Sequence, residues 1–193
     1  MFIQNLRRLT TSKSLRTPEA VQWLQKIKPV EELLDKLFSA ISPKLHSTAS
    51  TVMGRVRSGG LPIGSKGWPQ DDIVRIAGAA SGVSVIANRA SVCHVDTKGS
   101  KEWYDFLLTA GTYNKCWFRL PDLQLQLEYL PGTVVALNGR ILRHEVLEWK
   151  GGDRVCYAHW TRPNVLEALS TGPERDSESW PSWVAQSDYM DLN

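Results

Sequence analysis

The chain has 193 residues, of which 42% are hydrophobic and 22% are charged, values typical of a folded globular protein rather than a disordered one. Its three cysteines are odd in number and lack a CxxC spacing, which argues against a disulfide framework or a zinc knuckle and favours a reducing intracellular compartment. The longest uncharged stretch, residues 76–88, is shorter than the roughly 18 residues that a membrane-spanning helix needs.

Basic residues are concentrated in the first third of the chain. The net charge is +3, but residues 1–67 contain 11 Lys/Arg against 4 Asp/Glu, whereas residues 68–193 contain 12 against 16. A basic segment favours contact with nucleic-acid phosphates because it releases condensed counterions, although most moderate charge runs are merely solvated faces. Nucleic acid is therefore a candidate partner, and no membrane contact is expected.

Residues 1–16 have the composition of a mitochondrial transit peptide, since they contain four basic residues and no acidic one. The alternative, which we prefer, is a basic arm without a targeting role. The expected location is accordingly the nucleus or cytoplasm rather than the mitochondrion.

A helical segment is expected after this arm. Residues 17–19, Thr-Pro-Glu, form an N-cap with proline at the first helical position, and the apolar residues that follow recur at helical spacing up to Ile41. Pro29 is expected to split or kink this run. The pattern predicts two amphipathic helices before Pro43, with an apolar face that packs on the domain that follows.

Short runs of β-favouring residues dominate the middle of the chain. Glycine and proline are frequent over residues 58–69, which predicts three parts: a basic arm with helices at 1–57, a core at 58–169 and an acidic tail at 170–193. Within the core, the stretch 101–110 is expected to be helical. Many short strands separated by Gly, Pro or Asp predict a mainly β sandwich or barrel with flanking helices. The expected strands are 83–86, 92–96, 123–129, 133–137, 141–147 and 154–160.

Two histidines and an aspartate occur in the order His94-x-Asp96 and then His144, and Arg154 follows ten positions later. On a strand, His94 and Asp96 project to the same face and can reach one ion. Two imidazoles and a carboxylate on one face of an octahedral Fe(II) ion leave three positions open, and an arginine fork suits an acidic cosubstrate. The set predicts an iron oxygenase, with His144 closing the site from a later strand of a jelly roll.

Each of these residues also has a purely structural alternative. A His-x-Asp pair arises by chance roughly 0.2 times in a chain of this composition, so the pair alone is weak. His144 taken alone suits a core histidine satisfied by a backbone carbonyl, and Arg154 suits a strand-edge ion pair with Glu128 or Glu145. Asn88 has even spacing to His94 and either hydrogen-bonds a cosubstrate or base edge, or caps a turn. His159 is expected to be packed or to support a ligand.

Five longer motifs surround these residues: VSVIANRASVCHVD at 83–96, WYDFL at 103–107, LPDL at 120–123, YLPGTVVALNGRILRH at 129–144 and GDRVCYAHW at 152–160. Together they resemble the fungal TET/J-binding-protein-like 2-oxoglutarate dioxygenases over about residues 68–169. The resemblance implies a double-stranded β-helix (jelly roll, cupin-like) core preceded by an amphipathic helical segment, and the use of Fe(II), 2-oxoglutarate and O2. It also implies that His94, Asp96 and His144 bind iron and that Arg154 holds the distal carboxylate of 2-oxoglutarate.

The chain departs from the family's pattern at two positions. Val95 stands where a basic residue is expected, and Glu145 follows the distal histidine where glycine is common, so the substrate is in more question than the chemistry. The resemblance implies oxidation of a methyl group on a nucleic-acid base, a 5-methylpyrimidine. A hydroxylase of a small molecule or protein side chain, or a non-catalytic module that keeps the fold, is the alternative. Aromatic residues between 103 and 118 either support an extruded nucleotide or belong to the core.

Overall fold

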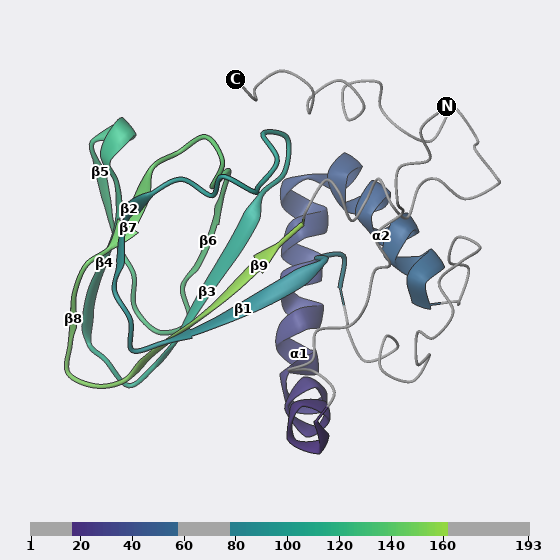
Figure 1. Cartoon of the computed structure of the whole chain (residues 1–193), viewed down its shortest axis with the longest axis horizontal. Helices are drawn as coiled ribbons and strands as arrows, with labels where there is room; N and C mark the ends of the chain where they lie inside the picture. Colours follow the sequence, from purple (N-terminus) through teal and green to yellow (C-terminus); the bar gives the residue numbers. More distant parts are fainter. Residues whose placement is uncertain (1–16, 58–77, 162–193) are drawn as a thin grey trace, which may run out of the picture. The chain divides into compact units, whose positions relative to one another are not determined.

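The computed structural model describes residues 17–57 and 78–161. Within these ranges the chain forms two compact units, one with the helices α1 (Pro18–Ile41) and α2 (Pro43–Arg57) and one with the strands (Figure 1). None of the described helices is long and apolar enough to cross a membrane. The boundary predicted near residue 58 and the tail predicted at 170–193 lie outside the described residues, and packing of the helices on the core stays a prediction.

The helical unit breaks at Ser42 rather than at Pro29. Thr17 caps α1 as predicted, because its Oγ accepts a hydrogen bond from Ala20 N at 3.2 Å. α1 then runs through Pro29 as one helix, so the prediction of two helices before Pro43 is wrong. A proline removes only one backbone hydrogen bond, whereas apolar side chains on both sides of it are buried in this unit. These buried residues are Leu24, Leu34 and Phe38 in α1 and Leu45, Ala49, Val52 and Met53 in α2.

The strand unit consists of two antiparallel sheets. Their strands are β1 (Gly82–Ala87), β2 (Ser91–His94), β3 (Asp105–Gly111), β4 (Lys115–Leu120), β5 (Leu125–Glu128), β6 (Val134–Leu137), β7 (His144–Val146), β8 (Trp149–Lys150) and β9 (Arg154–Trp160), with a 3-10 turn, η2 (Pro121–Leu123), between β4 and β5. The first sheet has the order β1-β9-β3-β6, and the second has the order β2-β7-β4-β5 with β8 beside β4 (Figure 1). Most neighbours in each sheet are distant in sequence, as in a jelly roll, so the predicted mainly β fold is confirmed.

A hydrophobic core joins the two sheets. On β4, Cys116, Phe118 and Leu120 point into it and alternate with less buried residues, as expected for a strand with one covered face. The first sheet contributes from β3, β6 and β9, and the second from β4 and β7. The members are Leu107, Tyr113, Cys116, Phe118, Leu120, Tyr129, Leu137, Val146 and Cys156.

The prediction of a helix over 101–110 is wrong, because Asp105–Gly111 form β3. This strand lies between β9 and β6, and most of its residues are buried. A strand in such a central position carries an apolar run in place of strict alternation, and periodicity alone does not separate that run from a buried helix. The strands β4 and β8 were not predicted either.

Candidate metal centre

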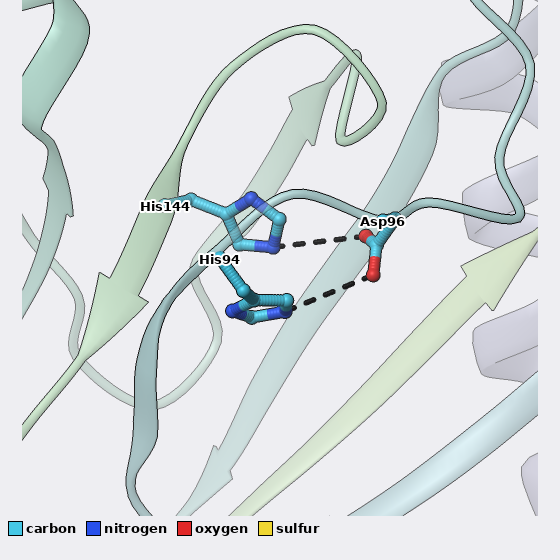
Figure 2. Close-up of side chains that lie close together, drawn as sticks. All are labelled: His94, Asp96 and His144. Carbon is cyan, nitrogen blue, oxygen red and sulfur yellow. Dashed lines mark ion pairs between the residues drawn. The ribbon is translucent and has the colours of Figure 1, made fainter. Parts of the chain in front are cut away.

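The three predicted ligands, His94, Asp96 and His144, come together in the strand unit (Figure 2). Their candidate ligand atoms all lie within 4.8 Å of one another. His94 Nε2 is 3.7 Å from Asp96 Oδ1, and His144 Nε2 is 3.7 Å from Asp96 Oδ2. Figure 2 shows both imidazoles turned toward the same carboxylate. Within residues 17–57 and 78–161, this is the one cluster of three or more side chains able to hold a metal ion.

Two strands and a turn bring these residues together. His94 ends β2 and pairs with His144, the first residue of β7, across the two antiparallel strands. Asp96 lies beyond the end of β2, so the prediction that strand alternation aligns it with His94 is wrong. Hydrogen bonds hold the turn instead: Asp96 N donates to Gly139 O, and Gly99 N donates to Asp96 O, both at 2.8 Å.

Backbone carbonyls orient both imidazole rings. His94 Nδ1 lies 2.7 Å from Val92 O, and His144 Nδ1 lies 3.0 Å from Leu142 O. A carbonyl only accepts hydrogen bonds, so each Nδ1 donates its hydrogen, and in the neutral ring the lone pair lies on Nε2. A metal-binding histidine typically has its second nitrogen fixed in this way. The two free lone pairs therefore lie on the side of the rings that faces Asp96.

His144 is held in the neutral form that a metal requires. Its ring is buried and lies nearly parallel to the ring of Phe118, with 5.9 Å between centroids and 14° between planes. Burial lowers the pKa of His144, and the neighbouring His94 lowers it further, against the raising effects of the Leu142 carbonyl and Asp96. The core-histidine alternative accounts for the burial and the carbonyl bond, but not for the nitrogen that faces Asp96.

Gly139 leaves room for the Asp96 carboxylate. A Cβ atom at this position would lie 2.5 Å from Asp96 Oδ2 and 2.6 Å from Asp105 Oδ2, closer than real Cβ contacts. Asp105 is itself buried, at the first position of β3. Sequence reasoning missed both residues. The Asn-Gly dipeptide at 138–139 signals a turn, but nothing local shows that this turn packs against a ligand.

The donor set fits the predicted Fe(II) ion. Two neutral imidazole nitrogens and one carboxylate on adjoining positions form the facial triad of non-haem iron oxygenases, which leaves coordination sites for other ligands. Gly139 supplies the space in which Asp96 lies, and the backbone of residues 92 and 142 fixes the rings.

Arg154 is buried and has no carboxylate partner in the part of the chain that the structure describes. Its residue exposure is 2%, and Nη1 reaches only Arg89 O at 3.5 Å. Among the described residues, no atom forms a hydrogen bond with Arg154 Nε, and no carboxylate pairs with the guanidinium. The alternative of a strand-edge ion pair is wrong for Glu145, whose Oε1 lies 3.6 Å from Arg119 instead. A buried cation of this kind calls for an anion to compensate it.

A cavity of about 960 Å³ opens beside the triad. His94 and Asp96 line it, together with the basic residues Arg89 and Lys98, and Val95 lies in its wall. His144 and Arg154 are not among the residues that line it.

The comparison with protein families decides the class of this site. Residues 4–166 match the Tet_JBP family, the oxygenase domain of the 2OGFeDO superfamily. The chain belongs to this family. The name of the superfamily states 2-oxoglutarate and iron chemistry, so the predicted family and the predicted class of dioxygenase are confirmed. No curated protein is similar enough to the chain to count as a match.

A solved structure supports the fold of this Tet_JBP domain. The chain is similar to NgTET1 in complex with 5mC DNA, with a TM-score of 0.57 and 15% sequence identity. The similarity covers 81% of this chain and 56% of NgTET1, so the Tet_JBP domain spans little more than half of that chain. At this identity the likeness is one of fold.

In the Tet_JBP domain, Asn88 caps a turn, which is one of the two roles predicted for it. It follows β1 with a φ of 48°, its Oδ1 accepts from Arg154 N at 2.8 Å, and its Nδ2 donates to Asp153 Oδ1 at 2.8 Å. Asn88 and His94 do not share a strand, because β1 ends before Asn88. Its role in cofactor binding stays a prediction. His159 is buried, lines the cavity and lies outside the triad, as predicted.

The aromatic residues predicted for nucleotide support belong mainly to the core of the Tet_JBP domain. The buried ones are Trp103, Phe106, Tyr113 and Phe118. None of these lines the cavity. Trp160, which sequence reasoning did not single out, does so instead, and its Nε1 donates to Ser84 Oγ at 3.1 Å. Gly82 admits this ring, because a Cβ there would overlap the indole.

Proposed function

We propose that this Tet_JBP domain oxidises a methyl group on a nucleic-acid base, with His94, Asp96 and His144 as the ligands of Fe(II). The observation that carries the proposal is the convergence of these three side chains, with both Nε2 atoms facing one carboxylate at the wall of a large cavity. With 2-oxoglutarate and O2, bound Fe(II) supplies the oxidation of a C–H bond. The protein supplies the orientation of the ligands and a shielded space next to them.

We further propose that Arg154 binds the distal carboxylate of 2-oxoglutarate. The guanidinium is buried and its Nε has no hydrogen-bond partner among the described residues. A carboxylate beside it would neutralise the charge and accept two parallel hydrogen bonds from the arginine fork. The cosubstrate thereby supplies an anion that the described residues do not provide at this point.

The cavity fits a nucleic-acid base better than a small free metabolite. Its volume of about 960 Å³ exceeds the needs of a cosubstrate alone. Arg89 and Lys98 place positive charge at its wall, where phosphates that flank a base would lie. The indole of Trp160 offers an aromatic surface for a base that has left the stack. NgTET1, which shares the fold, was solved in complex with 5mC DNA.

Mass spectrometry of a methylated oligonucleotide tests the proposal. The full chain is incubated with Fe(II), 2-oxoglutarate, O2 and an oligonucleotide that contains 5-methylcytosine, and the expected product is an oxidised 5-methyl group formed together with succinate. Asp96→Ala is the inactive control, and Glu148→Ala, a change at another exposed carboxylate, is the matched control that keeps activity.

The outcome separates the proposed substrate from the alternatives. Succinate release without any oxidised base would leave the oxygenase in place and contradict the nucleic-acid substrate, in favour of a small molecule or protein side chain. A chain that binds neither Fe(II) nor 2-oxoglutarate would instead be a module that keeps the fold without the reaction.

A further inference from the structure

We propose that Phe118 and Tyr129 are positioning residues that set the separation between the iron ligand His144 and the cosubstrate anchor Arg154. By fixing this separation, they select a keto diacid of five carbons over one that is shorter or longer. The inference rests on the proposed function, because it takes His144 and Arg154 as the two ends of the cosubstrate site.

A continuous chain of ring contacts runs from the triad to Arg154. The His144 ring lies nearly parallel to Phe118, with 5.9 Å between centroids. Phe118 meets Tyr129 edge to face, with 5.4 Å between centroids and 65° between planes. The guanidinium carbon of Arg154 lies 5.4 Å from the centre of the Tyr129 ring. All four residues are buried, at exposures of 5% or less.

Tyr129 is fixed at several points besides its ring. Its N–H donates to Cys116 O at 3.0 Å, and its carbonyl accepts from the Tyr113 hydroxyl at 2.7 Å. Its own hydroxyl donates to Leu107 O at 3.1 Å. These bonds connect Tyr129 to β4, to the residues after β3 and to β3 itself, so the ring cannot turn or shift without breaking buried hydrogen bonds.

Arg154 depends on this ring for its position. Nη1 of the guanidinium makes a long hydrogen bond to Arg89 O at 3.5 Å, and Nε has no partner within the described parts of the chain. The guanidinium also lies near the thiols of Cys116 and Cys156, where it opposes the rise in their pKa that burial causes. A cation over the face of a tyrosine is attracted to the ring, and more so where water is excluded. Tyr129 therefore helps to fix where the positive charge lies, and Phe118 connects the Tyr129 ring to the ring of His144.

A fixed separation discriminates between diacids by length. The keto acid end of the cosubstrate would lie at the triad and the distal carboxylate at Arg154, so one methylene more or less moves that carboxylate off the arginine fork. Close-packed interiors do not yield to such a change without strain. Phe118 and Tyr129 are the packed elements between the two ends, and smaller side chains there would release the constraint.

Binding calorimetry with three diacids tests the inference without turnover. The full chain is loaded with Mn(II) under nitrogen and titrated with oxaloacetate, 2-oxoglutarate and 2-oxoadipate, which have four, five and six carbons. The wild type is expected to bind 2-oxoglutarate the tightest. In Tyr129→Leu and Phe118→Met, we expect 2-oxoglutarate to bind about tenfold more weakly and its preference over 2-oxoadipate to disappear. Tyr129→Phe keeps the ring and should keep the preference.

Each other result has a defined meaning. Wild-type preference in both Tyr129→Leu and Phe118→Met would overturn the inference, as would loss of preference in Tyr129→Phe to the same extent as in Tyr129→Leu. If Tyr129→Leu does not fold, as judged by near-UV circular dichroism, Phe118→Met decides, since it nearly preserves volume. A wild-type chain that binds Mn(II) but none of the three acids would contradict the proposed function itself.

Discussion

Two of the candidate metal ligands, His94 and Asp96, and the candidate cosubstrate anchor are built in opposite ways. The side chains of His94 and Asp96 are 41% and 43% exposed, and their positions are set by backbone hydrogen bonds and strand pairing. Arg154 is 2% exposed, and its position is set by an aromatic ring in the core. The triad is preformed in the protein alone, whereas the anchor carries a buried charge that no described carboxylate pairs with and that we expect a bound anion to compensate.

Because of this contrast, substitutions in the triad and at Arg154 should have different effects on the free energy of unfolding, although both should reduce function. Removing the side chain of His94 or Asp96 takes little from the hydrophobic core, so function should fall while the fold remains. Removing the charge of Arg154 takes away an uncompensated buried cation, so function should fall while stability rises.

The largest effect is expected from Asp96→Ala. The variant loses the carboxylate that both imidazoles face, and Fe(II) affinity and turnover should fall by more than the roughly 100-fold that loss of a supporting residue costs. Because the side chain is half exposed, the free energy of unfolding should change by less than about 1 kcal/mol. Metal titration and urea unfolding measure the two quantities, with Glu148→Ala as the control. A large loss of stability would show that the triad also supports the fold.

Arg154→Met should weaken the binding of 2-oxoglutarate and at the same time stabilise the fold. We expect the Michaelis constant for 2-oxoglutarate to rise about 10- to 100-fold, because two charge-assisted hydrogen bonds to the carboxylate are lost. Without cosubstrate, the variant should be more stable than the wild type by about 1 kcal/mol or more, since an apolar side chain replaces a buried unpaired charge. Urea unfolding with and without 2-oxoglutarate checks this. A less stable variant with unchanged cosubstrate dependence would contradict the assignment.

Gly139→Ala should weaken the metal site while the remaining packing stays intact. The added Cβ would lie 2.5 Å from Asp96 Oδ2, so the carboxylate must move. We expect Fe(II) affinity to fall about 10-fold or more and the free energy of unfolding to fall by about 1–3 kcal/mol. Gly54→Ala in α2 is the matched control, because a Cβ there meets nothing within 4 Å. Unchanged metal affinity in Gly139→Ala would show that Asp96 can relax elsewhere.

The candidate ligands and most strands could be predicted because they depend on short-range patterns in the sequence. The order of His94, Asp96 and His144 was enough to name three side chains that do converge, although the reason given for Asp96 was wrong. The prediction of alternating faces needs a strand that continues past His94, and the chain turns there instead. Runs of β-favouring residues likewise predicted most strands of the jelly roll.

Features that depend on distant parts of the chain were missed. The sequence of β3 is a mostly apolar run without strand alternation, because β9 and β6 flank it on both sides. Both neighbours are remote in sequence, so the run was mistaken for a helix. Gly139 and Phe118 matter through contacts with Asp96 and His144, and no local pattern reports those contacts. The contact of Arg154 with Tyr129 joins β9 to the residue that follows β5, and it also became visible only in the fold.

The smallest effect is expected from a substitution in the exposed ion pair of Asp122 and Arg143, an arginine that, unlike Arg154, has a carboxylate partner. Asp122 Oδ1 accepts from Arg143 Nε at 2.7 Å, and Asp122 Oδ2 accepts from the backbone N of Arg143 at 2.8 Å. These hydrogen bonds hold the pKa of Asp122 below its ordinary value. The unfolded chain therefore takes up the proton first, so this contribution is complete above about pH 4 and is lost as the pH falls through the lowered pKa.

Asp122→Asn should remove the part of the loss of stability at acid pH that comes from protonation of Asp122. The amide cannot lose a proton, so the urea midpoint of the variant should fall less between pH 7 and pH 3 than that of the wild type. The difference should be small, because solvent screens an exposed pair. An equal acid dependence in both proteins would show that the pair contributes nothing measurable. A large difference would mean that the turn before His144 depends on Asp122, and the triad would then be less independent of the surrounding charges than its backbone bonds indicate.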